Sequence, residues 1–314
     1  MITPLQACGF LLAAYAVLSN DALQTLGTFL AGNRGRTPRQ AQAFFLCAVL
    51  VAVLLLGWLR NAGDPAWGRL EHFTLPESFS WIDLLPPLAV LALTQWGAPV
   101  STSFLLLTSF GPGALPALLL HSLLGYTVAL LFGGGAYRLL GSLFPGSAAA
   151  VERPGLWLVL QWAATGWLWS QWLIQDLANL YVYLPRQLEP VPMGASLAVL
   201  CAGVCLLTAE NGGAIQQVLS SKSQTQDPRA TTVLSVLFGL LLFALARWSP
   251  LPLSTTWVFL GLLGGRELAL AWQQPQPPLA AAGRSLGADL LKAGLGLAAS
   301  VAVALAVPLL KATL

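Results

Sequence analysis

Long apolar runs alternate with short polar breaks along the whole of this chain. A transmembrane helix needs about 20 apolar residues to cross roughly 30 Å of hydrocarbon, and most of these runs approach or exceed that length. The pattern therefore predicts an all-α polytopic membrane protein. The apolar segments fall at 5–31, 41–59, 83–96, 99–112, 114–143, 155–184, 193–209, 231–248, 253–272 and 285–308.

Two pairs of segments are predicted to be re-entrant hairpins. Segments 83–96 and 99–112 are too short to cross, and only Gly97 and Ala98 separate them, so we expect a hairpin near 83–112. Segments 231–248 and 253–272 flank a proline-rich turn in the same way, which indicates a second hairpin near 231–272. Because these arms are long enough to cross, the sequence leaves open whether they turn back or span fully.

The segments divide into two sets of five, one in residues 1–150 and one in residues 151–314. With one hairpin in each set, each half crosses the membrane an odd number of times. Two halves of this kind must insert in opposite orientations. The pattern thus predicts the inverted repeat that many secondary transporters share.

Composition supports a membrane protein and argues against other classes. Only 9% of the 314 residues are charged, 56% are hydrophobic, and the mean hydropathy is +0.72. Such a surface suits the lipid bilayer. No polar stretch is long enough to form a soluble catalytic domain, so we do not expect an enzyme. The net charge of +3 is small and dispersed, which argues against nucleic-acid partners.

The arginines after the first apolar segment predict the orientation. Arg34, Arg36 and Arg39 lie in one short loop without an acidic residue. Cytoplasmic loops carry an excess of Lys and Arg, so this loop is predicted to face the cytoplasm. We therefore expect a protein integral to the plasma (inner) membrane, with its N-terminus outside.

A polar signature occurs twice inside the apolar segments. Residues 19–24 (SNDALQ) are echoed by 174–179 (IQDLAN), and a proline followed by hydroxyl residues comes later in each half, at 99–103 and 252–256. Pro99 follows Asp21 by 78 residues, and Pro252 follows Asp176 by 76. Carboxylates at membrane depth are costly and usually functional, so the duplication points to a transport site.

The acidic signatures suit a small monovalent cation. Asp21 and Gln24 are three residues apart, as are Asp176 and Asn179, so each pair lies on one helical face. These side chains offer charge and neutral oxygens to a cation such as Na⁺. Backbone carbonyls from a helix break, expected at Ser19–Asn20, would complete the coordination. The alternative is that each Asp is buried and satisfied by hydrogen bonds.

The hydroxyl clusters suit a tetrahedral oxyanion. Each follows a proline and opens an apolar helix, where free N–H groups and a partial positive charge attract anions. Two clusters from inverted halves would meet near the midplane. The alternative is that these side chains cap the helices or pack between them. The residues are Ser101, Thr102, Ser103, Ser254, Thr255 and Thr256.

These motifs resemble those of the inorganic phosphate transporter (PiT) family. The family signatures Asn-Asp-Val-Ala-Asn-x-x-Gly-Thr and Pro-Val-Ser-Thr-Thr occur in both halves of its members. Residues 20–28 here read NDALQTLGT and 99–103 read PVSTS, while 175–179 read QDLAN and 252–256 read PLSTT. The loops at 37–41 and 211–213 are also similar to family loops. The resemblance spans nearly the whole chain.

The resemblance implies an inverted-repeat carrier that moves phosphate by alternating access, usually together with Na⁺ or H⁺. It implies that Asp21, Gln24, Asp176 and Asn179 serve the coupling cation. It also implies that Asn20, Gln175 and the six hydroxyl residues hold the anion. Gln175 and Gln24 replace family asparagines, and Phe104 and Trp257 stand where the family often has His. These departures leave sulfate or another oxyanion as an alternative substrate.

Two other classes of function were considered. An intramembrane hydrolase would use Asp21 and Asp176 as a carboxylate dyad, although this would not explain the hydroxyl clusters. A degenerate carrier would act as a scaffold. Arg186, in the loop after the second signature, is interpreted as an interfacial anchor. We expect no cofactor beyond the coupling ion, and the sequence leaves open whether the protein is a monomer or a homodimer.

Overall fold

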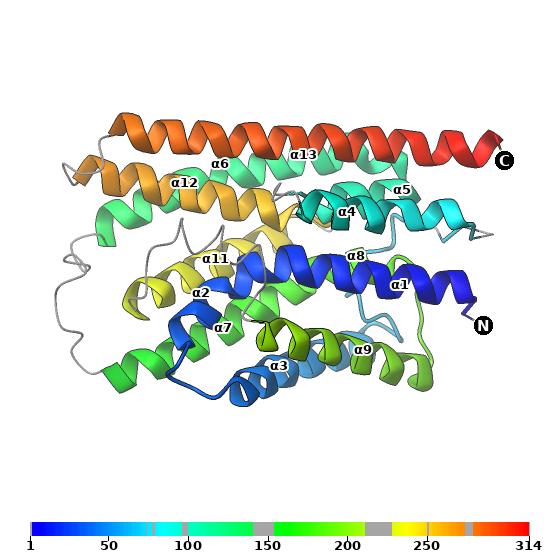
Figure 1. Ribbon diagram of the computed structural model, residues 1–314, viewed down its shortest axis with the longest axis horizontal. Helices are drawn as coiled ribbons and strands as arrows, with labels where there is room; N and C mark the ends of the chain where they lie inside the picture. Colours follow the sequence, from blue (N-terminus) through cyan, green and yellow to red (C-terminus); the bar gives the residue numbers. More distant parts are fainter. Residues whose placement is uncertain are drawn as a thin grey trace.

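The computed structural model describes residues 2–73, 75–76, 79–95, 100–140, 154–210, 228–249, 251–273 and 279–313. These residues form helices joined by turns, with no strand among them (Figure 1). The elements are α1 (Pro4–Val17), η1 (Leu18–Ala22), α2 (Leu23–Asn33), α3 (Arg39–Arg60), η2 (Trp81–Leu84), α4 (Leu85–Gln95), η3 (Ser103–Leu107), α5 (Thr108–Phe110), η4 (Pro112–Ala114), α6 (Leu115–Leu140), α7 (Pro154–Asp176), α8 (Ala178–Tyr181), α9 (Pro190–Ala209), α11 (Pro228–Trp248), α12 (Thr255–Gln273) and α13 (Leu279–Thr313).

The helices have the length and composition of membrane spans. Five stretches among the described residues are long and apolar enough to cross a bilayer: Arg39–Arg60, Pro112–Leu140, Pro190–Ala209, Arg229–Trp248 and Ala280–Lys311. Within the described residues, the predicted apolar segments fall largely on helices or on consecutive helices. The all-α polytopic fold is therefore confirmed.

The first hairpin turns back inside the molecule, as predicted. In Figure 1, α4 runs from the end that carries the N-terminus and stops near the middle, and η3 and α5 return toward the same end. α6 then runs to the opposite end. The predicted tip of the hairpin, residues 96–99 with Pro99, lies outside the described residues.

α11 and α12 form the second predicted hairpin, and whether its arms cross the membrane stays a prediction. α11 and α12 both occupy the half of the molecule opposite to the first hairpin, and they meet near the middle (Figure 1). α11 runs toward the middle of the molecule and α12 runs back from it, although α11 is long enough to cross a bilayer. α13 then runs the full length of the molecule. The predicted division at residue 150 falls within 141–153, outside the described residues, and stays a prediction.

Opposite directions of the two hairpins fit an inverted arrangement. The helices α1 and α2 run away from the N-terminal end, and α7 runs toward it (Figure 1). α3 then runs back toward the N-terminal end, and α9 runs away from it. The loop between α2 and α3, with its arginines, lies toward the end opposite the N-terminus. Which end faces the cytoplasm stays a prediction.

Glycines allow α6 and α12 to pack closely. A Cβ on Gly261 would lie 2.3 Å from the carbonyl oxygen of Tyr126, and one on Gly265 would lie 2.1 Å from that of Leu130. Side chains cannot fit in these positions, so the two backbones touch directly. Membrane helices commonly associate through small residues in this way. The contact fixes the second hairpin against α6.

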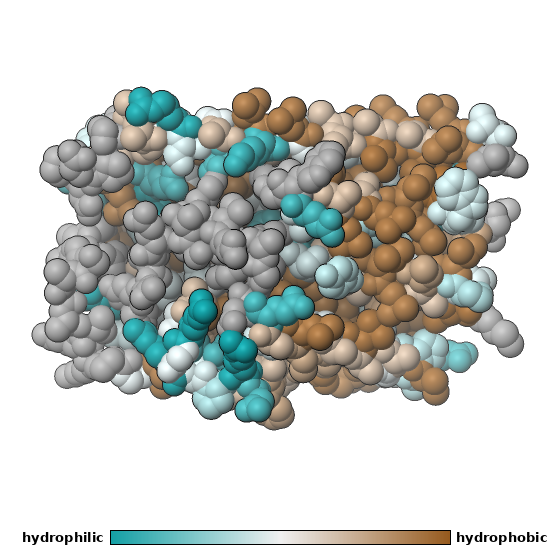
Figure 2. All heavy atoms as spheres, in the orientation of Figure 1, coloured by the Kyte–Doolittle hydropathy of each residue, from teal (hydrophilic) through white to brown (hydrophobic). Residues whose placement is uncertain are grey.

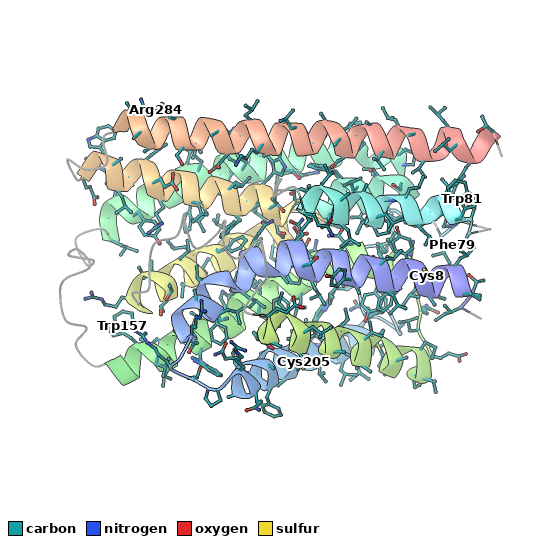
Figure 3. All side chains as sticks on the ribbon, in the orientation of Figure 1. Cys8, Phe79, Trp81, Trp157, Cys205 and Arg284 are labelled. Atoms are coloured by element: carbon teal, nitrogen blue, oxygen red, sulfur yellow. The ribbon has the colours of Figure 1, made fainter. Side chains whose placement is uncertain are left out.

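The surface matches a bilayer environment. On the visible face, brown apolar residues cover the half nearer the termini of the chain (Figure 2). Phe79 and Trp81 lie at one end of the molecule and Trp157 and Arg284 lie at the other (Figure 3). Trp81 is 59% exposed. Aromatic and cationic side chains are frequent at both membrane interfaces.

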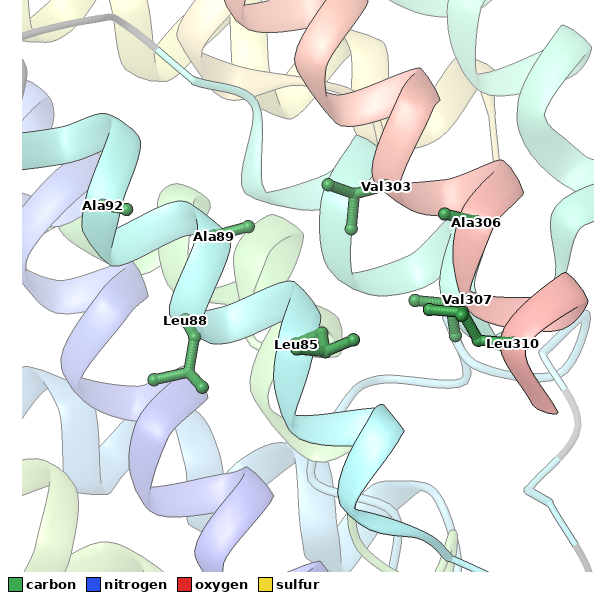
Figure 4. A pocket seen from close by; sticks show the side chains of 8 residues that line it. All are labelled: Leu85, Leu88, Ala89, Ala92, Val303, Ala306, Val307 and Leu310. Atoms are coloured by element: carbon green, nitrogen blue, oxygen red, sulfur yellow. The ribbon is translucent and has the colours of Figure 1, made fainter. Parts of the chain in front are cut away.

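One cavity of about 380 Å³ lies between α4 and α13 (Figure 4). Its lining is wholly aliphatic and includes Leu85 and Leu88 on α4 and Val303 and Val307 on α13. Without polar groups, this cavity is not a site for an ion. The polar residues singled out in the sequence gather elsewhere.

Candidate functional site

Asp21 lies on a π-helix within the first long helix. Residues Leu18–Ala22 form η1, which joins α1 to α2 without interrupting the chain of helical turns. The helix break expected at Ser19–Asn20 is therefore corrected to a widened turn. A π-turn accommodates one extra residue, and such turns often occur at functional sites. Asn20 and Asp21 are each only 1% exposed.

Asp176 is the last residue of α7, and a single residue with helical backbone angles separates it from α8. α7 ends at Asp176, Leu177 forms a turn, and α8 begins at Ala178. Asp176 and Asn179 are both buried. Helical hydrogen bonds continue across this junction, since Leu177 N donates to Leu173 O and Tyr181 N donates to Leu177 O.

Three donors surround the carboxylate of Asp21. Asn20 Nδ2 donates to Oδ1 at 3.0 Å, and Thr256 Oγ1 donates to the same oxygen at 3.0 Å. Thr102 Oγ1 donates to Oδ2. Thr102 and Thr256 come from different hydroxyl clusters, so both clusters meet at this one acid.

The carboxylate of Asp176 has a matching environment. Thr255 Oγ1 donates to Oδ2 at 2.6 Å, and Asn179 Nδ2 donates to Oδ1 at 2.9 Å. Thr255 occupies the place in its cluster that Thr102 occupies in the first. Each half therefore repeats one contact, in which the second hydroxyl residue of its cluster donates to the acid of its own signature.

Thr102 joins the two acids into one network. Its Oγ1 donates to Asp21 and accepts a hydrogen bond from Asn179 Nδ2 at 3.0 Å. Asn179 in turn donates to Asp176. A path of three hydrogen bonds therefore connects the two carboxylates. Burying two carboxylates together is costly, and these donors offset part of that cost.

Two of the predicted anion ligands are helix caps. Ser101 Oγ accepts from Phe104 N at 3.4 Å, and Ser254 Oγ accepts from Trp257 N at 3.3 Å. Both residues open the returning arm of their hairpin. The capping alternative therefore applies to Ser101 and Ser254. The capping oxygens face the backbone.

The carboxamide residues beside the acids contact backbone carbonyls. Asn20 Nδ2 donates to Val100 O at 2.9 Å, and Gln175 Nε2 donates to Leu242 O at 3.2 Å. Each thereby ties its signature helix to a neighbouring hairpin. Gln24 is buried but takes no part in the hydrogen bonds around Asp21.

Three buried oxygens near the acids have no hydrogen-bond partner among the residues that the structure describes: Asn179 Oδ1, Gln175 Oε1 and Ser103 Oγ. An unsatisfied buried polar atom costs about 1–3 kcal/mol, so such atoms need an explanation. Neutral oxygens beside a carboxylate are ligands that hard cations accept. Among the described residues, no cluster of three His, Cys, Asp or Glu side chains forms a metal centre.

Sequence reasoning missed Arg69. This residue lies in a polar break of the sequence, yet it is only 7% exposed. Its Nη2 donates to Ala246 O at 3.5 Å, at the inner end of α11. Arg186 Nη2 donates to Phe73 O at 2.6 Å, a contact within the protein, and its expected role as an interfacial anchor stays a prediction.

The whole fold has a known counterpart. It matches a solved sodium-dependent phosphate transporter. The TM-score is 0.65, and the match covers 99% of this chain and 99% of the other, at 16% sequence identity. No family model matches the chain, and no curated protein matches it. At this identity the comparison shows that the two proteins share a fold. The function of this chain has to be inferred from the residues of its site.

Proposed function

We propose that this protein is a divergent PiT-like carrier that moves a small tetrahedral oxyanion across the plasma membrane together with Na⁺ or H⁺. Phosphate is the first candidate substrate and sulfate the second. The observation that carries the proposal is the hydrogen-bond network in which Thr102 links Asp21 to Asn179 and Asp176. One buried site thus combines two acids with hydroxyl residues from both hairpins.

Coupling follows from the charges of this site. Two buried carboxylates repel an anion, so the anion binds well only after cations neutralise them. Asn179 Oδ1 and Gln175 Oε1 supply neutral oxygens for a cation near Asp176. Ser103 and the threonines then offer hydroxyl donors to the anion. Cation and anion binding would therefore reinforce each other.

The fold suggests how access alternates. The hairpins enter from opposite ends (Figure 1), and Thr102 and Thr256, one from the returning arm of each hairpin, both donate to Asp21. A movement that opens one hairpin and closes the other would expose the site to each side in turn. A hydrolase is less well supported, because the path of hydrogen bonds between the acids passes through Thr102 and Asn179.

Uptake by purified protein in liposomes tests the proposal. Labelled phosphate and labelled sulfate are offered under an inward Na⁺ gradient and then under an inward proton gradient. We expect one gradient to drive accumulation of at least one anion above its equilibrium level. Equal, slow leakage of both anions under every gradient, indistinguishable from protein-free liposomes, would contradict the proposed function.

A further inference from the structure

Arg69 occupies an unusual place for a cation. The loop that carries it folds into the interior, where Ala66 is 0% exposed, Leu70 is 2% exposed and Phe73 is 1% exposed. Burying a guanidinium is costly unless a partner offsets its charge. Its position inside the molecule therefore calls for an explanation beyond membrane anchoring.

Local turns hold the loop in a strained form. Asp64 accepts hydrogen bonds from Ala66 N and Gly68 N, each at 2.7 Å. Ala62 and Trp67 have φ values of 51° and 59°, a region that costs non-glycine residues about 1 kcal/mol or more. Such strain persists only where surrounding contacts enforce it.

The segment of this chain that carries Arg186 and Leu188 supplies those contacts. Leu188 N donates to Gly63 O at 2.8 Å, and Trp58 Nε1 donates to Leu188 O at 2.7 Å. Arg186 binds the far end of the loop at Phe73 O. The loop is thus fastened at both ends, and Arg69 lies between the fastened points.

Arg69 and Gln175 contact successive turns of one helix face. Arg69 reaches Ala246 O and Gln175 reaches Leu242 O, four residues earlier on α11. Gln175 is the immediate neighbour of Asp176, whose negative charge acts on Arg69. Burial lowers the pKa of the Arg69 guanidinium to about 10 and Asp176 opposes this, so the group stays protonated at neutral pH.

We propose that Arg69 is the cationic contact for the transported oxyanion, and that a cation bound at Asp176 releases it for this role. The inference rests on the proposed function and names a recognition residue within it. In the anion-free site, Asp176 and Arg69 partly neutralise each other. A coupling cation at Asp176 takes over the carboxylate, and the guanidinium becomes available to the anion.

The chemistry of arginine suits this task. Its planar guanidinium presents parallel N–H donors that match two oxygens of a phosphate or sulfate ion. The hydroxyl donors of the hairpins carry no charge. Arg69 would thus supply a fixed positive charge that attracts the anion and offsets its repulsion by the two acids. The cation must bind first, which yields ordered binding.

Transport kinetics of Arg69→Gln separate this role from a structural one. Losing a charged hydrogen-bond partner is expected to raise the KM for inorganic phosphate, or for sulfate if that is the anion transported, by about 10- to 100-fold. The coupling-cation concentration for half-maximal uptake should fall or stay constant, because Arg69 no longer competes for Asp176. A structural defect would lower the maximal rate, or it would raise both the anion KM and the cation concentration for half-maximal uptake.

Two further variants complete the experiment. Arg69→Lys keeps the charge without the planar fork, so the anion KM should rise by less than in Arg69→Gln. Arg60→Gln removes an exposed charge at the end of α3 and should leave both constants unchanged. If Arg69→Gln fails to reach the membrane, the KM of Arg69→Lys decides, and a wild-type value overturns the proposal.

The outcomes distinguish this inference from the proposed function. Wild-type protein that accumulates neither anion under either gradient overturns the proposed function and the role of Arg69 together. Wild-type accumulation combined with an unchanged anion KM in Arg69→Gln overturns the role of Arg69 alone. A raised anion KM together with a raised cation requirement also overturns it.

Discussion

Asn179 Nδ2 donates to Thr102 Oγ1 at 3.0 Å, although the two residues are 77 positions apart. Thr102 also donates to Asp21, and Asn179 also donates to Asp176. One threonine and one asparagine thereby connect the acid of each signature. A change at either acid would reach the other through these two side chains, which is the physical basis for treating the acids as one site.

Neutralising either acid should abolish accumulation. In Asp21→Asn or Asp176→Asn the site loses the charge that attracts the coupling cation, while the amide retains most of the side-chain volume. We expect accumulation of labelled anion to drop to background, with normal membrane insertion and an intact size-exclusion profile. Uptake at the wild-type rate would show that the substituted carboxylate has no part in coupling.

Thr102→Val should impair transport far more than its neighbour Thr108→Val. Valine keeps the shape but removes the hydroxyl that bonds Asp21 and Asn179. Leaving these buried groups unsatisfied costs about 1–3 kcal/mol, so uptake should fall about tenfold or more. Thr108 donates only to the carbonyl of Phe104 in its own helix turn, so it serves as the matched control.

Thr102→Ser refines that experiment because it keeps the hydroxyl. It should retain most of the activity that Thr102→Val loses. The double variant Thr102→Val/Asn179→Ala should be non-additive relative to its two single variants, with a coupling energy of about 0.5–3 kcal/mol. Strict additivity would mean that the two side chains act independently.

Gly265→Ala should destabilise the protein. The added Cβ would lie 2.1 Å from Leu130 O and 2.6 Å from Gly134 N, and these backbone atoms cannot move aside easily. Forcing α6 and α12 apart should cost about 1–3 kcal/mol and lower the unfolding temperature in detergent. Gly287→Ala, in α13 with no atom within 4 Å of the new Cβ, is the control and should not lower it.

Asp64→Ala should weaken transport from outside the site. The carboxylate organises the loop by accepting from Ala66 N and Gly68 N. Without it the strained turn relaxes and Arg69 loses its fixed position, so the anion KM should rise while the maximal rate changes less. Asp64→Asn keeps one acceptor oxygen and should show a smaller rise. An unchanged KM in both variants would mean that the loop holds its form by packing alone.

Much of the fold was predictable because membrane helices follow simple rules. Length and hydropathy placed the predicted apolar segments on most of the described helices, and an odd number of crossings in each half predicts inversion. The convergence of Asp21 with Thr102 was also foreseeable, because polar side chains inside apolar segments have few places to go except towards one another.

Three features lay beyond sequence reasoning for physical reasons. The π-turn at Asp21 and a full helix break have the same sequence signal, since both place polar residues within an apolar run. The capping role of Ser101 and Ser254 depends on where each returning arm begins, within one or two residues. Arg69 lay in a polar loop, and only tertiary contacts reveal that this loop folds inward.

Anion binding to the purified protein at a series of Na⁺ concentrations and pH values tests the central claim most directly. If the acids and the hydroxyl residues form one pocket, raising the coupling cation should tighten anion binding about tenfold or more, and the anion should tighten cation binding by the same factor. Asp176→Asn should remove this dependence. Anion affinity that ignores both Na⁺ and pH, in the wild type as in the variant, would contradict the account.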